Sequence, residues 1–251
     1  MSRNDKDANV KQDTMEKMRN SEAVFVILSD YTHMPYVACD PKTFDDQVFL
    51  YFSEEDAKEA VRRFAGNQES TRAAKLEKNG FLAFYTNLFA MGVNCIKMNQ
   101  GTSREVAVQL GELVRRPEAD KLPQGQVRIE NPELHLTALY YMQELRKRRD
   151  GGTDQLKELN EELMAHFKEG RYIVAVQEDK KVPLLKQKDG SAFQPIFTDV
   201  IEFQKFNREQ KFKSAVIEAK NLLKVLVPEA KGVVINPFGV NLQLPITRKT
   251  K

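Results

Sequence analysis

Histidines and cysteines, which often carry acid–base, nucleophilic or metal chemistry, are few in this chain and lie far apart in its sequence. Among its 251 residues are three histidines, His33, His135 and His166, and two cysteines, Cys39 and Cys95. A catalytic or metal-binding histidine needs a carboxylate or thiol beside it, and only His33 lies near a cysteine. No third residue is placed to orient that pair, and the cysteine spacing is not that of a zinc site. We therefore predict no catalytic residue, no metal and no cofactor, and we favour a protein that is not an enzyme.

The charged clusters of the sequence have structural explanations. Glu54, Glu55 and Asp56 stand at the start of an expected helix, and the basic run 146–149 stands at the end of another. Helix dipoles stabilise carboxylates and cations at these two positions. The net charge of +3 arises from 39 basic and 36 acidic residues, and no glycine-rich phosphate loop occurs. We therefore do not expect a nucleic-acid partner.

One short motif is left without a complete structural explanation, the turn Asn236-Pro237-Phe238-Gly239. Asn at the first position, Pro at the second and Gly at the fourth are typical of a type I turn. Phe238 occupies the third position, which constrains its side chain least, so a large aromatic there needs another reason. Either its ring packs back onto the sheet, or it is exposed and contacts a partner. The sequence leaves both alternatives open.

Hydrophobic patterning predicts the elements that would position this turn. In the first half we expect strands at 23–28, 34–38, 48–52 and 93–98, helices at 53–66 and 81–90, and either a strand or a helix at 105–110. In the second half we expect strands at 172–176, 182–186, 193–197, 212–217, 232–235 and 240–244, and helices that begin at Thr198 and Asn221. Two helices, which begin at Asn131-Pro132 and at Thr153, lie between these halves. The charged stretch 69–78 is assigned to no element.

The two halves share one order of elements, which indicates an internal repeat. The matched residues are Pro35 with Pro183, Phe52-Ser53 with Phe197-Thr198, Gly92 with Gly232, and Gly101 with Gly239. Two copies of such a unit can pack as a pseudo-symmetric pair with a cleft between them. We predict a polar N-terminal segment at 1–20, one unit at 21–115, a linker and helical pair at 116–170, and a second unit at 171–251.

Several stretches of the second half resemble the N-terminal domain of the SseB family, bacterial proteins named for enhanced sensitivity to serine. The resemblance is carried by residues 131–134, 172–176, 182–185, 193–199 and 232–239. Residues 23–113 look like a diverged second copy, in which Asn99-Gln-Gly101 stands at the turn in place of Asn-Pro. The resemblance implies an α+β domain and no established enzyme activity. We therefore expect an α+β protein of two repeated mixed-sheet units with flanking helices, joined by a helical pair.

The functional prediction follows from the repeat and from the lack of a catalytic set. We expect a binding or protein-interaction module of the bacterial cytoplasm, because no segment has the roughly 18 continuous apolar residues of a membrane span. Its partner would be another protein or a second copy of the chain. The alternative is an amino-acid-related small-molecule ligand, or an enzyme site, between the two copies. The predicted binding residues are Phe197, Thr198, Asn236, Pro237, Phe238 and Gly239.

Overall fold

The computed structural model describes residues 3–116, 127–147, 154–179 and 181–246, with side chains from residue 8 onward. The chain divides into two compact units, which we treat separately. The first unit holds Met1–Pro117 with Arg146–Arg149, and the second holds Glu118–Leu145 with Asp150–Lys251. The helical pair is thus grouped largely with the second unit. The domain boundaries expected at residues 20, 115 and 170 stay predictions, and most of the expected linker, 117–126, lies outside the described residues.

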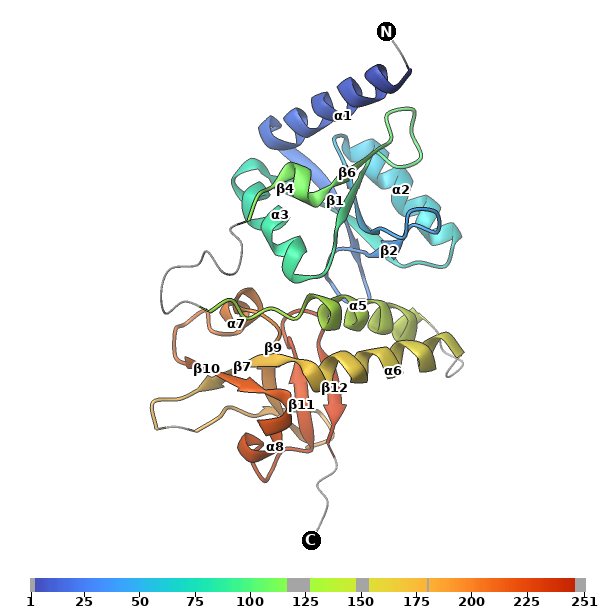
Figure 1. Ribbon diagram of the computed structural model, residues 1–251. Helices are drawn as coiled ribbons and strands as arrows, with labels where there is room; N and C mark the ends of the chain where they lie inside the picture. The colour runs from blue at the N-terminus through green and yellow to red at the C-terminus, as the bar shows by residue number, and fades with distance from the viewer. Residues whose placement is uncertain (1–2, 117–126, 148–153, 180, 247–251) are drawn as a thin grey trace. The chain divides into compact units, whose positions relative to one another are not determined.

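The first unit is a mixed sheet with helices packed around it (Figure 1). Its strands are β1 (Ala23–Ser29), β2 (Ala38–Cys39), β3 (Asp46–Tyr51), β4 (Thr71–Glu77), β5 (Cys95–Met98) and β6 (Val106–Gln109). Its helices are α1 (Arg3–Asn20), α2 (Glu54–Gly66), the short η1 (Lys78–Gly80), α3 (Phe81–Ala90) and α4 (Leu110–Leu113). The strand order is β4-β1-β3-β5-β6, with β2 beside β3. Of these pairs only β3 and β5 run parallel.

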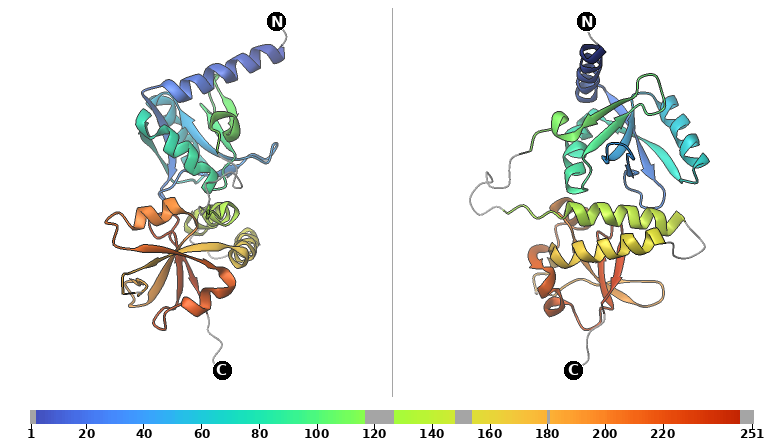
Figure 2. Two further views of the ribbon diagram at one scale, coloured as in Figure 1. Left: turned by 60° about the vertical axis from the view of Figure 1, so that its left-hand side comes forward. Right: turned by 45° about the vertical axis from the view of Figure 1, so that its right-hand side comes forward.

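The second unit repeats that arrangement (Figure 2). Its strands are β7 (Arg171–Val176), β8 (Leu185–Lys186), β9 (Ala192–Phe197), β10 (Lys213–Glu218), β11 (Gly232–Ile235) and β12 (Leu242–Pro245). Its helices are α5 (Pro132–Lys147), α6 (Asp154–Glu169), α7 (Val200–Phe206), the short η3 (Ala219–Asn221) and α8 (Leu222–Val225). The strand order is β10-β7-β9-β11-β12, with β8 beside β9, and β9 runs parallel to β11. Helices α5 and α6 lie side by side, and the hydroxyl of Thr137 donates to Glu162 Oε1 at 3.0 Å.

The identical strand order confirms the internal repeat and the α+β class. Val26 pairs with Leu50 in the first sheet, and Val174 pairs with Ile196 at the equivalent place in the second. These pairs differ by 148 and 146 positions, so a short difference in length separates the copies between their first and third strands. Pro35 and Pro183 also differ by 148, the offset of the first strands.

The other residue matches predicted between the two copies are wrong, because the structurally equivalent residues lie one position or more away. The N-cap of α7 is Asp199 rather than Thr198, because Asp199 Oδ1 accepts from the Glu202 N–H at 2.9 Å. Its counterpart is Ser53, whose Oγ accepts from the Asp56 N–H at 3.1 Å at the start of α2. Phe52 therefore corresponds to Thr198. A hydroxyl and a carboxylate both suit the N-cap, so neighbouring Thr198 and Asp199 could not be told apart by type alone.

The two glycine matches also fail. Gly92 lies in a turn at φ 80°, whereas Gly232 lies inside β11. The residue equivalent to Gly239 is Thr102, since both backbone N–H groups donate to the carbonyl of an asparagine three residues earlier. The glycines are therefore required for different local reasons in the two copies.

Strand β4 was absent from the predicted elements. Residues 71–77 carry three charged side chains, and apart from buried Thr71 they are half-buried or exposed. An edge strand needs only one apolar face, here the face on which Ala73 packs against the core cluster that includes Phe64 of α2. Such a strand shows weak apolar patterning, which is why the sequence alone did not indicate it.

Candidate functional site

The turn after β11 is fixed by the side chain of Asn236. Its Oδ1 accepts from the Thr198 N–H at 3.0 Å, and its Nδ2 donates to Thr198 Oγ1 at 2.8 Å. Its backbone carbonyl accepts from the N–H groups of Gly239 at 2.8 Å and Asn241 at 3.0 Å. Asn236 itself has φ 48°, a left-handed conformation that asparagine tolerates better than most residues. The turn therefore forms the i to i+3 bond expected from the sequence and is tied to the end of β9.

An asparagine at the end of β5 fixes the equivalent turn of the first unit in the same way. Asn99 has φ 50°, its N–H donates to the Leu50 carbonyl at 2.8 Å, and its Oδ1 accepts from the Phe52 N–H at 3.2 Å. Asn99 and Asn236 thus hold equivalent positions at the ends of β5 and β11. The shared requirement of the repeat is this asparagine rather than the proline that follows it in the second copy.

The predicted binding residues gather around one turn but differ in their exposure. Phe197, Thr198 and Asn236 are fully buried, and Pro237 and Gly239 are half-buried. The ring of Phe238 is 62% exposed. Of the six predicted residues, Phe238 therefore presents the large accessible side chain, and the buried ones hold it in place.

Thr198 lies at the centre of a buried polar network. Its hydroxyl donates to Asp199 Oδ2 at 2.8 Å, and His135 Nδ1 lies 3.4 Å from Thr198 Oγ1 and 3.5 Å from Asp199 Oδ2. Burial disfavours the charged carboxylate of Asp199. The hydrogen bond and charge of His135, with bonds from the Glu202 N–H and Thr198, outweigh that cost and lower the pKa of Asp199.

The network does not have the geometry of a nucleophile with its base. In a catalytic set the histidine takes the hydroxyl proton, and the carboxylate holds the far side of the ring. Here the Thr198 hydroxyl donates directly to Asp199, and the same ring nitrogen of His135 lies near both groups. All three side chains are almost fully buried. The arrangement fixes the end of β9 against α5 and α7.

Asn131 provides a second tie between α5 and the sheet. Its Nδ2 donates to the carbonyls of Arg171 at 2.8 Å and Thr198 at 2.7 Å, and its Oδ1 accepts from the Arg171 N–H at 3.1 Å. The sequence predicts this residue at the helix start, where its carbonyl indeed accepts from the His135 N–H at 2.9 Å. The side chain, however, bonds to β7 and to the end of β9.

Phe238 belongs to a group of three phenylalanines that we call the aromatic surface: exposed Phe238 with half-buried Phe206 and Phe212. The Phe206 ring centroid lies 6.0 Å from that of Phe238 and 5.2 Å from that of Phe212. Phe206 also lies 5.2 Å from the buried ring of Phe197, so the aromatic surface continues into the core. The three rings line a hollow of about 390 Å3. Phe238 therefore packs partly on Phe206 while most of its ring stays accessible.

Basic side chains border the aromatic surface. The hollow is also lined by Lys205, Arg208 and Lys211. Lys205 pairs with the buried carboxylate of Glu202, and Lys211 pairs with Glu209. Arg208 is exposed and forms no ion pair within the described part of the chain. The rim consequently carries an excess of positive charge beside an apolar centre.

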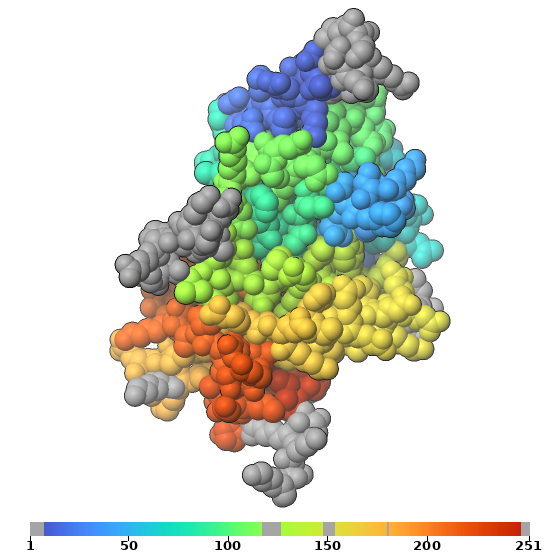
Figure 3. Space-filling model, in the orientation of Figure 1, coloured from blue at the N-terminus to red at the C-terminus, as the bar shows by residue number. Residues whose placement is uncertain are grey.

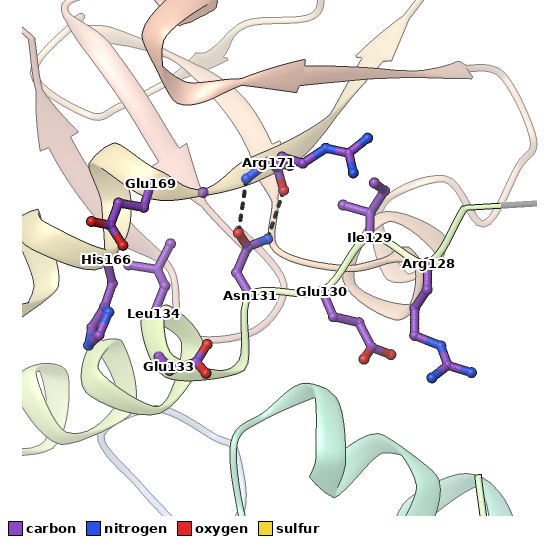
Figure 4. Close-up of a pocket in the computed structure, with 10 residues that line it drawn as sticks. Arg128, Ile129, Glu130, Asn131, Glu133, Leu134, His166, Glu169 and Arg171 are labelled. Carbon is purple, nitrogen blue, oxygen red and sulfur yellow. Dashed lines mark hydrogen bonds between the residues drawn. The ribbon is translucent and has the colours of Figure 1, made fainter. Parts of the chain in front are cut away.

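A second depression of the second unit, which we call the polar pocket, has a volume of about 530 Å3 (Figure 4). It lies where the segment before α5, the start of α5 and the end of α6 meet. Arg128 and Arg171 contribute cations, and Glu130, Glu133 and Glu169 contribute carboxylates. Figure 4 shows the bonds between Asn131 and the Arg171 backbone at its centre. Charges of both signs in one pocket suit a small zwitterion.

Other candidate groups are not assembled into sites. Within the described residues, no three or more His, Cys, Asp or Glu side chains could together hold a metal ion. Cys39 is exposed and Cys95 is buried, and neither forms a disulfide. Of the basic run 146–149, Arg146 and Lys147 end α5, and Arg148 and Arg149 lie outside the described residues. No described helix is long and apolar enough to cross a membrane.

Comparison with known families gives a match within the second unit. Residues 152–248 match the model of the SseB protein N-terminal domain. The second unit carries an SseB-like domain. This match confirms the resemblance stated for the second half, and it contains β7 to β12 and the aromatic surface. The first unit lies outside the matched residues, and its relation to the SseB-like domain is carried by the shared strand order.

Comparison with individual proteins adds little. No curated protein matches the chain at a significant level. Among solved structures, Tic22 from Plasmodium falciparum is 15% identical with a TM-score of 0.25, over 88% of this chain and 90% of that one. Anabaena Tic22 (protein transport) is 12% identical with a TM-score of 0.23, over 85% and 84%. TM-scores this low carry no argument about fold or function.

Sequence reasoning missed the aromatic neighbours of Phe238 and the partners of Thr198 in the buried network, His135 and Asp199. Phe206 and Phe212 precede Phe238 by more than twenty positions, and His135 precedes Thr198 by 63. Phe203 and Phe206 are apolar positions of a predicted helix, which indicates only that they pack. The spatial meeting depends on the parallel pairing of β9 and β11, which no local pattern reveals.

Proposed function

We propose that this chain is a non-enzymatic protein-interaction module, and that its SseB-like domain binds a partner through the aromatic surface. The observation that most strongly supports this proposal is that Phe238 is 62% exposed on a turn held by buried hydrogen bonds. Burying a phenylalanine ring contributes about 1.5–3 kcal/mol. A ring held in advance loses little conformational entropy on binding, so most of that free energy is available to an interface.

The chemistry of the surface favours an acidic segment that also carries a large apolar side chain. The apolar side chain would fill the hollow between Phe206, Phe212 and Phe238. Carboxylates of the partner would lie beside Arg208 and Lys211 at its rim. A second copy of the chain is the competing occupant. We place the interaction in the bacterial cytoplasm, a location supported by the bacterial SseB family.

The experiment compares three forms of the full chain as bait in a bacterial lysate: wild type, Phe238→Ser and Leu82→Ser. Leu82 is the matched control because it is 68% exposed on α3 of the first unit. We expect at least one protein that wild type and Leu82→Ser retain and Phe238→Ser does not. If Phe238→Ser retains every protein that the wild type retains, the aromatic surface is not the binding site.

The polar pocket favours a second function, binding of a small zwitterion such as a free amino acid. Arg128 and Arg171 could pair with a carboxylate, and Glu130 or Glu133 could pair with an ammonium group. A ligand that binds only the folded state must raise its melting temperature. A thermal-shift panel of amino acids tests this function, with Arg171→Gln as the variant. If no compound raises the wild-type melting temperature, this second function is excluded.

A further inference from the structure

Among the described residues, strand β10 forms an open edge of the SseB-like sheet. It pairs with β7 on one side, and it is the first strand in the order β10-β7-β9-β11-β12. Five of its six residues are exposed, and Ile217 is half-buried. Half of the backbone N–H and C=O groups of an edge strand point away from the sheet and can bond another chain. Its centre, Ala215-Val216-Ile217, is apolar and has none of the charges that usually protect such an edge.

The equivalent edge of the first unit is better covered. Helix α2 has 13 residues and packs on β4, whereas its counterpart α7 has seven. Helix α3 has ten residues, whereas its counterpart α8 has four. The residue paired with Phe25 in the first sheet is Lys75, and the residue at the equivalent place in the second sheet is Val216, which is 50% exposed. Shortened helices thus leave apolar surface beside β10 on both faces of the sheet.

On one face this surface is a groove of about 760 Å3, which we call the edge groove. The register of β10 with β7 pairs Ala215 with Val174 and Ile217 with Tyr172, so these side chains share one face. The end of α8 and the segment before β8 form the opposite wall. The apolar lining includes Val174, Val176, Val182, Leu184, Ile217 and Val227. The groove lies directly beside the unpaired edge of β10.

We propose that an extended segment of a partner protein adds to β10 as a further strand, with alternate apolar side chains in the edge groove. Successive side chains of a strand point to opposite faces, so every second residue of the added strand would face the groove. The charged residues near β10 indicate one further property of the added strand. Glu218 pairs with Lys220 at 2.8 Å and Lys211 pairs with Glu209, whereas exposed Lys213 has no ion-pair partner within the described residues. The added strand therefore carries an acidic residue beside Lys213. The proposal does not depend on the aromatic surface.

The probe is a peptide selected from a random phage-displayed library on the full chain. We expect enriched sequences in which apolar and polar residues alternate and an acidic residue stands at one end. The synthetic peptide, followed by fluorescence anisotropy, should slow hydrogen exchange of the amides of residues 213–218. A version with N-methyl groups on alternate residues of the bonding edge should bind about tenfold more weakly or worse, because it lacks the required N–H donors.

Variants of the exposed edge residues test the site without disturbing the core. Ala215→Lys places a charge at the mouth of the groove and should weaken peptide binding about tenfold or more. Lys213→Glu should weaken the acidic peptide and favour the same peptide with lysine in place of its acidic residue. Leu82→Lys, an exposed apolar position of the first unit, should leave affinity unchanged, as should Phe238→Ser. Melting temperatures establish that each variant is folded.

Three results would overturn the proposal. The first is a library that yields no alternating sequence, and the second is a selected peptide that binds Ala215→Lys or its N-methylated form with unchanged affinity. The third is concentration-dependent dimerisation of the wild type that Ala215→Lys abolishes, which would assign the edge to a second copy of the chain. Peptide binding lost in Phe238→Ser but kept in Ala215→Lys would assign the peptide to the aromatic surface instead.

Discussion

Replacing Asn236 with alanine should destabilise the SseB-like domain more than a typical surface substitution. The change removes two hydrogen bonds to Thr198, at 3.0 Å and 2.8 Å, from a site with no solvent access. It leaves the Thr198 N–H without its acceptor, while the Thr198 hydroxyl keeps its bond to Asp199 at 2.8 Å. It also places an alanine at φ 48°, where its Cβ is strained.

The expected magnitude follows from these three contributions. A buried N–H without a partner costs about 1–3 kcal/mol, and the lost bond to the hydroxyl costs about 0.5–1.5 kcal/mol. The left-handed conformation costs alanine about 1–2 kcal/mol, a cost that asparagine avoids in part and glycine avoids altogether. We therefore expect Asn236→Ala to lower the free energy of unfolding by about 3–5 kcal/mol, a large part of the 5–15 kcal/mol typical of a domain. Asn236→Gly should cost about 1 kcal/mol less than Asn236→Ala.

Urea unfolding followed by far-UV circular dichroism measures the effect, with hydrogen exchange to assign each transition to a unit. The matched control is Asn99→Ala, which removes the equivalent bond to the Phe52 N–H in the first unit. Asn236→Ala should lower exchange protection in β9 and β11, and Asn99→Ala should lower it in β3 and β5. A loss below about 1 kcal/mol for Asn236→Ala, or an equal effect of alanine and glycine, would refute this account of the turn.

Three further predictions concern buried groups. The lowered pKa of Asp199 stabilises the fold, and this stabilisation is complete above the ordinary carboxyl pKa of about 3.9 and is lost as pH falls through the pKa of the folded state. Asp199→Asn should therefore flatten the acid limb of a stability–pH curve, and an unchanged acid limb would contradict this. Gly232→Ala should cost about 3 kcal/mol in urea unfolding, because its Cβ would overlap the Leu244 carbonyl; a loss within about 0.5 kcal/mol would count against that packing. Thiol titration at pH 8 should modify exposed Cys39 in the native protein and Cys95 only after unfolding, since burial raises the pKa of Cys95 to about 11; equally fast modification of both would be inconsistent.

Local patterns were sufficient for most elements of the fold. Buried strands such as β1 and β11 are continuous apolar runs, and the start of α2 at Ser53 carries its own capping signal. The repeat was recognised because the order of elements is the same in both halves, although side-chain identity is low. Strand β4 was missed because an edge strand with three charges in seven residues resembles a polar loop.

The site could be predicted only in part, because its contacts are non-local. The turn at Asn236-Pro237-Phe238-Gly239 was found from residue preferences alone, but the exposure of Phe238 depends on where Phe206 and Phe212 end up. Gly239 illustrates the limit. Its turn position explains a glycine, yet a Cβ there would also overlap the buried carboxylate of Glu202, a contact between the turn after β11 and α7 that no spacing indicates.

The edge groove was found only by comparing the helices of the two units. The centre of β10 has no protecting charges in its sequence, but the apolar surface beside it becomes evident only when α7 and α8 are compared with α2 and α3. Figure 3 shows how much surface α6, drawn in yellow, contributes to the same unit. That helix is buried at Leu156, Leu163 and Phe167 and is otherwise largely accessible. The ends of α7 and α8 therefore decide which apolar surface of the SseB-like domain is accessible to the partners that we propose.

Site-specific photo-crosslinking is the sharpest test of our proposal that Phe238 contacts another protein. A benzophenone amino acid placed at position 238, and at position 82 as control, would be activated in living bacterial cells that express the full chain. The account predicts a specific adduct with a second protein from position 238 and none from position 82, because Phe238 stands exposed on the aromatic surface. No intermolecular adduct from position 238, or the same adducts from both positions, would contradict it.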